Sequence, residues 1–70
     1  MKERAIFLQE LNENDDVVFI LLNEFIDGKV FEKYTPLIKC IELSNVNISG
    51  TPTVKNIIVD TESIIAWGKK

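Results

Sequence analysis

The stretch 37–49 constrains the fold of this 70-residue chain more than any other feature of the sequence. Apolar and polar residues alternate along it, as on a strand with one buried face. The alternation changes phase by one residue at Ser44-Asn45, and the apolar positions on either side are Ile41, Leu43, Val46 and Ile48. A period of two that changes face within one run predicts a β-bulge or sharp bend. We therefore expect one long, curved strand of the kind that closes a small barrel.

The rest of the chain is also typical of strands. Valine, isoleucine and threonine supply 20 residues, whereas there are only two alanines, and this balance favours pleated surfaces over helices. Asp27-Gly28 lies between apolar-rich runs and predicts a two-residue hairpin turn, because glycine accepts the positive φ of a type I′ turn. That turn would join a strand over 17–26 to one over 29–34. Thr35-Pro36 should then end the second strand, since proline donates no ladder hydrogen bond.

The first third of the chain leaves two interpretations open. Apolar residues between 18 and 26 also fit one face of a helix, with Asn14 or Asp15 as its cap and Gly28 beyond its end. The β-branched and aromatic residues 17–20 favour a strand instead. Residues 3–11 are equally open between a short helix and the first strand of a hairpin. After the curved strand we expect a turn at 50–52, a strand over 53–60, a polar corner at 60–63 and a last short strand over 64–67.

The segment 56–67 consists of an apolar strand, a one-turn polar corner and a final short apolar strand. It resembles the last two strands of an Sm-like or SH3-like barrel. The match covers 12 residues and lacks the glycine and asparagine of the second Sm motif, and 29–43 does not reproduce the first, so no RNA-binding residue is carried over. The resemblance implies barrel topology only. We predict one all-β or β-dominated domain over 1–70, a meandering sheet or SH3/Sm-like barrel of five to six short strands, with one short helix in the first third left open.

The composition excludes several function classes. There is no histidine and only one cysteine, Cys40, so the commonest general base and any intramolecular disulfide are absent. We expect Cys40 in the core, no catalytic activity, no metal and no cofactor. The polar corner 60–63 is interpreted as a turn rather than a cation site. The N-terminus lacks the apolar segment of a signal peptide, and the longest apolar run, 17–22, is far shorter than a membrane span. We therefore expect a cytoplasmic protein with no membrane partner.

The net charge of −3 belongs to the first sixteen residues, because the six acids and six lysines of 17–70 cancel. A candidate acidic surface lies there, formed by Glu10, Glu13, Asp15 and Asp16. An alternative function follows from it, namely a small acidic inhibitor of the mobile-element type that binds a basic surface on a larger target. No cluster of lysine or arginine is present, and this argues against a nucleic-acid partner.

The chain carries more apolar side chains than one small core can hide. Of its 70 residues, 32 are apolar, and a chain of this size buries only about 60% of its surface on folding. Phe25 and Phe31 flank the expected hairpin tip and Trp67 ends the last run, so these three are candidate partner-binding residues. We predict a non-catalytic protein-interaction module that forms homo-oligomers, with no small-molecule substrate. A single-strand nucleic-acid binder that stacks bases on such aromatics, Tyr34 included, is a further alternative.

Overall fold

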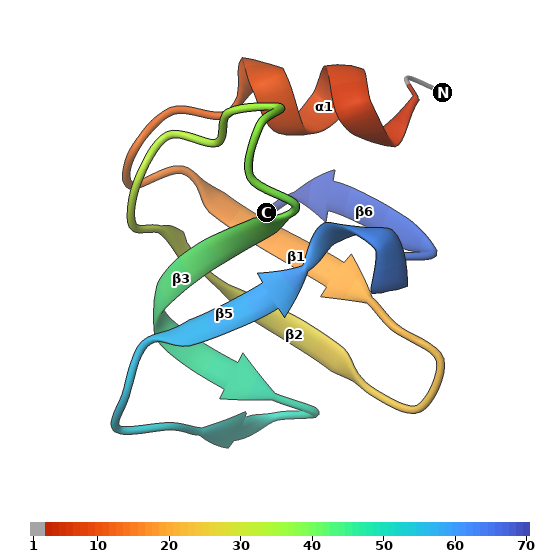
Figure 1. Cartoon of the computed structure of the whole chain (residues 1–70). Coiled ribbons are helices and arrows are strands. Elements are labelled where there is room, and N and C mark those ends of the chain that lie inside the picture. Colours follow the sequence, from red (N-terminus) through yellow and green to blue (C-terminus); the bar gives the residue numbers. More distant parts are fainter. Residues whose placement is uncertain (1–2) are drawn as a thin grey trace.

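Six antiparallel strands and one short helix make up the computed structural model, which describes residues 3–70 (Figure 1). In chain order the elements are α1 (Arg4–Glu10), β1 (Asp16–Ile20), β2 (Phe25–Val30), β3 (Cys40–Ile48), β4 (Thr51–Pro52), β5 (Ile57–Asp60), the 3-10 helix η1 (Thr61–Ser63) and β6 (Ala66–Lys69). The prediction of a small β-dominated fold is confirmed, and the short helix that was left open in the first third is present as α1. Met1 and Lys2, which belong to the N-terminus considered above, lie outside the described residues.

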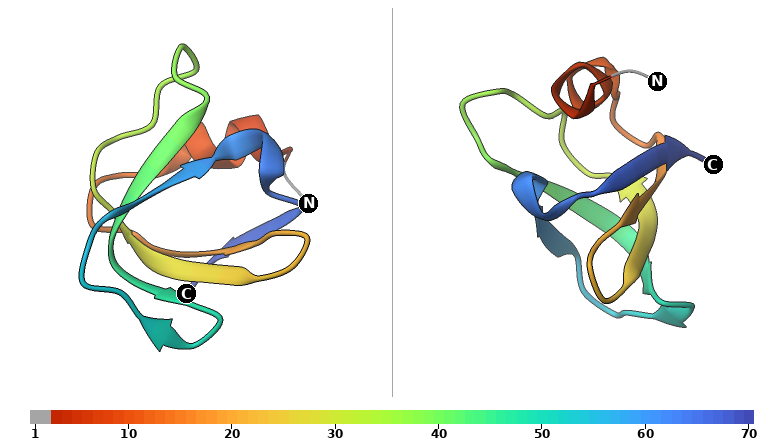
Figure 2. Two further views of the ribbon diagram at one scale, coloured as in Figure 1. Left: turned by 60° about the horizontal axis from the view of Figure 1, so that its bottom comes forward. Right: turned by 90° about the vertical axis from the view of Figure 1, so that its right-hand side faces the viewer.

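The six strands form one curled sheet in the order β4-β3-β2-β1-β6, with β5 also paired to β3. β3 pairs with β2 along one edge and with both β5 and β4 along the other. Leu43 pairs with Val30 of β2 and Ile57 of β5, and Asn47 pairs with Asp27 of β2 and Pro52 of β4. η1 then carries the chain from β5 across to β6, which pairs with β1 (Figure 2). As a result, β5 and β6 each use only one edge for pairing within the described part of the chain.

The predicted bend in the long strand is confirmed. Lys29 of β2 pairs with Ser44, whereas Asp27 pairs with Asn47, so β3 has one more residue than β2 between these two pairs. Asn45 takes a φ of 50° at this bulge, a conformation that asparagine tolerates better than most residues. The extra residue restores the inward orientation, and both Leu43 and Val46 are buried.

The predicted Asp27-Gly28 hairpin turn is wrong. Both residues lie within β2, and the chain turns instead at 21–24, where the Leu21 N–H donates to the Glu24 carbonyl at 2.8 Å. A Cβ at Gly28 would lie 2.9 Å from the Ser44 carbonyl oxygen and 3.2 Å from Val46 Cγ2. Glycine is therefore needed here because the bent β3 approaches the backbone closely, and not because the chain turns.

The two open interpretations of the first third are now resolved. Residues 4–10 form a helix, whereas 16–20 and 25–30 form strands. The predicted strand over 29–34 is wrong at its end, because β2 stops at Val30 and Thr35-Pro36 lies within the loop 31–39. β5 is shorter than the predicted 53–60, and β6 begins two residues later than predicted. The polar corner is the turn η1, in which Asp60 Oδ1 accepts the Glu62 N–H at 3.0 Å.

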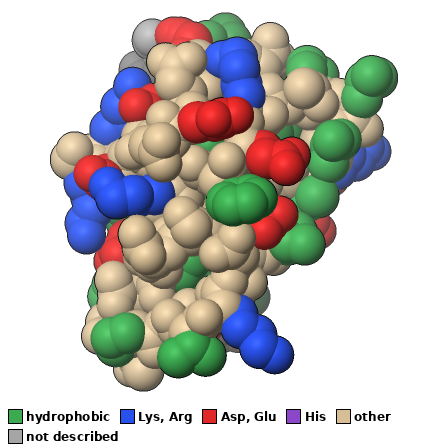
Figure 3. All heavy atoms as spheres, turned by 90° about the vertical axis from the view of Figure 1, so that its left-hand side faces the viewer, with side chains coloured by type: hydrophobic (Ala, Val, Ile, Leu, Met, Phe, Trp, Pro, Cys, Tyr) green, Lys and Arg blue, Asp and Glu red, His purple; other side chains and the backbone are tan. Residues whose placement is uncertain are grey.

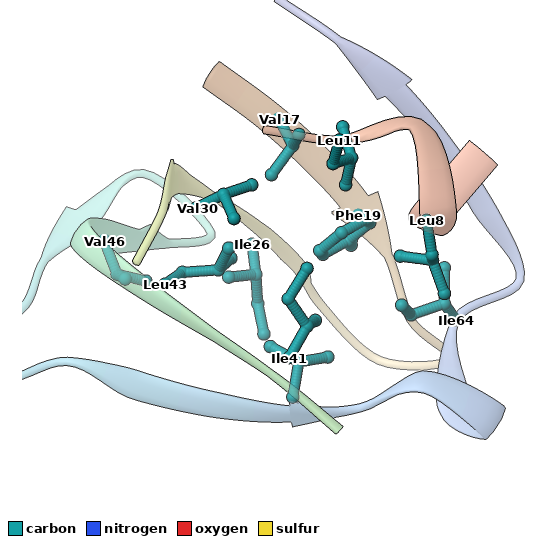
Figure 4. Close-up of a cluster of buried hydrophobic side chains, with 11 residues drawn as sticks. Leu8, Leu11, Val17, Phe19, Ile26, Val30, Ile41, Leu43, Val46 and Ile64 are labelled. Carbon is teal, nitrogen blue, oxygen red and sulfur yellow. The ribbon is translucent and has the colours of Figure 1, made fainter. Parts of the chain in front are cut away.

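The core lies inside the curl of the sheet (Figure 4). Its buried side chains come from α1 and the residue after it and from β1, β2, β3, β5 and the end of η1; they are Leu8, Leu11, Val17, Phe19, Ile26, Val30, Ile41, Leu43, Val46, Val59 and Ile64. Phe19 is the largest fully buried side chain. One face of the sheet and one face of α1 therefore enclose a single apolar cluster.

Helix α1 is held over the core by contacts at both ends. At seven residues it is too short to be stable alone. Arg4 Nη1 donates to the Ile64 carbonyl at 3.1 Å, and Lys33 Nζ donates to the carbonyls of Gln9 at 3.3 Å and Leu11 at 3.0 Å. Within residues 3–70, no helix has the length and apolar character needed to cross a membrane.

Candidate functional site

The side chains of β2, β3 and β5 that point away from the core form a second face of the sheet. The Phe31 N–H donates to the Glu42 carbonyl at 3.0 Å, and Glu42 pairs with Ile58, so these three residues form one row across the sheet. Cys40 pairs with Asp60 in the next row of β3 and β5. We call these five residues the outer face. It mixes exposed apolar groups, with Phe31 46% and Ile58 65% exposed, and carboxylates.

A pocket of about 180 Å³ opens on the outer face, between β3, β5 and the loop 31–39. Its apolar lining comes from Tyr34, Ile38, Cys40, Ile41 and Ile58. Pockets that hold small molecules usually measure about 300–1,000 Å³, and this one is smaller; a shallower hollow of about 580 Å³ adjoins it at Cys40 and Ile58. Its volume suits a single side chain.

The rim of this pocket is acidic. Glu32 and Glu42 line it, and Asp60 lies in the next row of the outer face. Glu42 accepts a hydrogen bond from Asn56 Nδ2 at 2.9 Å, which positions the carboxylate without neutralising it. Lys33 also lines the pocket, but its ammonium group is bound to the backbone carbonyls of α1 and of Leu11. Figure 3 shows this side of the molecule, with hydrophobic side chains gathered next to acidic ones.

Within residues 3–70, β5 and β6 each present unpaired backbone groups along one edge. The Glu42 carbonyl accepts the Phe31 N–H, so the backbone groups of Glu42 face the β2 side of β3. The backbone groups of its neighbours Ile41 and Leu43 face the other side, where these residues pair with Val59 and Ile57 of β5. The N–H and C=O of Ile58 therefore point away from the sheet. On β6 the Lys70 N–H donates to the Asp16 carbonyl at 3.0 Å, which sets the same alternation. The backbone N–H and C=O groups of Trp67 and Lys69 therefore point away from β1.

The three aromatic candidates from the sequence are not brought together. Phe31 belongs to the outer face, Phe25 is half-exposed at the other end of β2, and the expectation that both flank a hairpin tip is wrong. Trp67 is half-buried on β6 and packs against the core, with its ring centroid 6.5 Å from that of Phe7. Among the described residues this is the one aromatic ring pair.

The acidic candidates divide into two pairs. Glu10 and Glu13 are exposed at the end of α1 and in the loop after it. Asp16 forms an ion pair with Lys29 at 3.0 Å, and Asp15 accepts the Asn12 N–H at 2.8 Å and lies 3.4 Å from Lys69 Nζ. The hydrogen bond from the Asn12 backbone, assisted by Lys69, lowers the pKa of Asp15 although burial acts in the opposite direction. Part of the predicted acidic surface is thus already neutralised within the chain.

Cys40 is not a core residue, contrary to the sequence-based expectation. It is half-buried in the wall of the pocket, because the buried phase of β3 is that of Ile41 and Leu43. The residues 3–70 contain no group of three or more histidine, cysteine or acidic side chains placed to hold a metal ion.

Comparison with protein families, with characterised proteins and with solved structures finds no match to this chain. Its class is therefore defined by its own fold and surface. It is a small antiparallel β protein with an early helix, an open edge on each of the strands β4, β5 and β6 among the described residues, and an acidic, apolar outer face.

Proposed function

We propose that this chain is a non-catalytic protein-interaction module that associates with copies of itself. The observation that carries the proposal is the pair of open edges on β5 and β6. An unpaired edge offers a row of backbone donors and acceptors to another strand, and proteins normally cover or block such edges. Exposed aliphatic side chains accompany both edges, since Ile58 on β5 is 65% exposed and Ile65 just before β6 is 61% exposed.

The charges at the two edges favour pairing between unlike edges. Asp60 and Glu62 lie at the end of β5, whereas Lys69 and Lys70 lie at the end of β6. Lys69 and Lys70 also pair with Asp15 and Asp27 of their own chain at 3.4 Å. Two β5 strands paired in parallel would bring like charges together, whereas β5 of one copy paired in parallel with β6 of the next would bring opposite charges together. Such a head-to-tail contact gives a closed ring or an open chain of copies.

Light scattering coupled to size-exclusion chromatography tests the proposal. We expect a mass that is a multiple of the 8.0 kDa chain. Ile58→Lys places a charge on the β5 edge and should reduce the mass to that of one chain. Leu22→Lys is the matched control, because Leu22 is an exposed aliphatic residue in the 21–24 turn, outside both edge strands. A single-chain mass for the unmodified protein at every concentration would refute self-association, and an equal effect of the two variants would refute the role of the edge.

The two alternative functions receive less support. The acidic-inhibitor function needs a free negative surface, yet Asp15 and Asp16 lie next to Lys69 and Lys29. A single-strand nucleic-acid binder needs aromatic platforms in a positively charged groove. Here Phe31 stands beside the carboxylates of the outer face, which repel phosphate groups.

A further inference from the structure

We propose that the pocket of the outer face receives Val54 from a second copy of this chain, with Lys55 placed against the acidic rim. This inference rests on the proposed self-association and names one contact within it. Val54 and Lys55 lie side by side in the loop 53–56, which joins β4 to β5. The pocket and the loop would thus form a complementary pair carried by every copy.

Val54 is fully exposed, at 100%. It therefore does not fill the pocket of its own chain, and it leaves a complete aliphatic side chain in water. The pocket offers the matching apolar surface through Tyr34, Ile38 and Ile58, and its volume of about 180 Å³ suits one side chain. Transfer of a valine side chain from water into such a site is favourable.

The neighbours of Val54 distinguish it from Leu22, an aliphatic residue that is also strongly exposed. Lys55 follows it directly and forms no ion pair among residues 3–70, and neither do Glu32 and Glu42 at the pocket rim. Leu22 is instead close in sequence to Glu24, which the rim would repel. Charge complementarity thus selects the loop 53–56 of a second copy as the occupant.

The loop is also held in one conformation before any contact forms. The Thr53 N–H donates to the Val46 carbonyl at 2.8 Å, and Thr53 Oγ1 lies 3.1 Å from that carbonyl and 3.0 Å from the Lys55 carbonyl. Asn56 closes the other end through its bond to Glu42. A loop that is already ordered loses little conformational entropy on binding.

The pocket and the loop are different surfaces of one chain, so the contact is head-to-tail unless two copies exchange their loops about a two-fold axis. It can repeat from copy to copy, as the contact between unlike edges also can. Cys40 gives a direct report on it, because it is the only cysteine in the chain and lines the pocket. An occupied pocket should shield the thiol from an alkylating reagent such as N-ethylmaleimide.

The test compares Val54→Asp with Leu22→Asp by light scattering and by the rate of Cys40 alkylation. Val54→Asp should raise the dissociation constant of the assembly about tenfold or more, as expected when burial of one aliphatic side chain is lost. It should also speed alkylation in the concentration range where the unmodified chain is assembled. Leu22→Asp should change neither quantity. Residues 53–56 lie outside the core, so Val54→Asp should fold normally, and circular dichroism checks this.

A charge exchange provides the second arm. Lys55→Glu and Glu32→Lys should each weaken assembly alone, and an equimolar mixture of the two should recover part of it through the restored pair. If the chain assembles but Val54→Asp leaves its mass and the Cys40 alkylation rate unchanged, the pocket contact is refuted while self-association stands. If the unmodified chain has the mass of a single copy throughout, both proposals are refuted.

Discussion

The side chains on the two faces of β3 differ in burial: the inward ones pack in the core, and the outward ones border an open pocket. The inward face carries Ile41, Leu43 and Val46, which contact the rest of the core and are at most 2% exposed. The outward face carries Cys40 and Glu42, which border a pocket that the chain itself leaves open. The inward face is specified by packing within one copy, where each side chain has many neighbours. The outward face is free to be specified by a partner.

A matched pair of phenylalanines gives the largest contrast between the faces. Phe19 is fully buried, whereas Phe31 on the outer face is 46% exposed. Phe19→Ala should lower the free energy of unfolding by about 3–5 kcal/mol. Phe31→Ala should lower it by at most about 1 kcal/mol. Urea unfolding followed by Trp67 fluorescence at one protein concentration measures both, and similar losses would show that the outer face contributes to the fold as much as the core does.

Two glycines provide the next contrast. Gly28→Ala puts a Cβ 2.9 Å from the Ser44 carbonyl oxygen, so the bent β3 must move. We expect a loss of about 1–3 kcal/mol, as for other overpacked sites. Gly68→Ala is the control, because a Cβ there has no neighbour within 4 Å. It should change the free energy of unfolding by no more than about 0.5 kcal/mol. A harmless Gly28→Ala would mean that β2 and β3 can separate without cost.

The same glycine explains where sequence reasoning failed. Asp27-Gly28 looks like a turn locally, but the reason for the glycine is the contact with Ser44 and Val46, which are distant in sequence. The bend at Ser44-Asn45 was predictable because the alternation within one strand records it. The local alternation therefore predicted the inward face of β3, whereas the contact of Gly28 with Ser44 and Val46 could not be predicted from the residues around Gly28.

The outer face could be predicted only in part. Phe31 was selected from the sequence, but its row with Glu42 and Ile58 depends on how β5 pairs with β3. No local pattern encodes that pairing. The one available signal was the adjacent pair Ile57-Ile58, since neighbouring residues of a strand face opposite sides and one of two isoleucines must point outward. Cys40 was expected in the core although the local alternation through Ile41 and Leu43 already placed it on the opposite face of β3.

Lys33 joins the outer loop to the core, and its removal tests how far the two regions are coupled. Its ammonium group bonds to the carbonyls of Gln9 and Leu11 beside α1. Lys33→Met should lower the free energy of unfolding by about 1 kcal/mol and speed hydrogen exchange in α1. Lys39→Met is the control, because its ion pair with Glu62 spans 3.7 Å between exposed side chains and should contribute little. Equal exchange rates in both variants would show that Arg4, Leu8 and Leu11 hold α1 without Lys33.

The smallest expected effect is the response of the loop before β1 to acid. The hydrogen bond from the Asn12 N–H, with Lys69 nearby, lowers the pKa of Asp15 below the ordinary value of an aspartate side chain. A carboxyl whose pKa is lower in the folded state stabilises that state above its unfolded pKa, and the contribution is lost as the pH falls through the folded pKa. We therefore expect Asp15→Asn to lower the urea midpoint at neutral pH, and the difference from the unmodified protein to vanish in acid. Asp16→Asn controls for the loss of one surface charge. A difference for Asp15→Asn that persists below the folded pKa would show that the side chain acts through its shape rather than its charge.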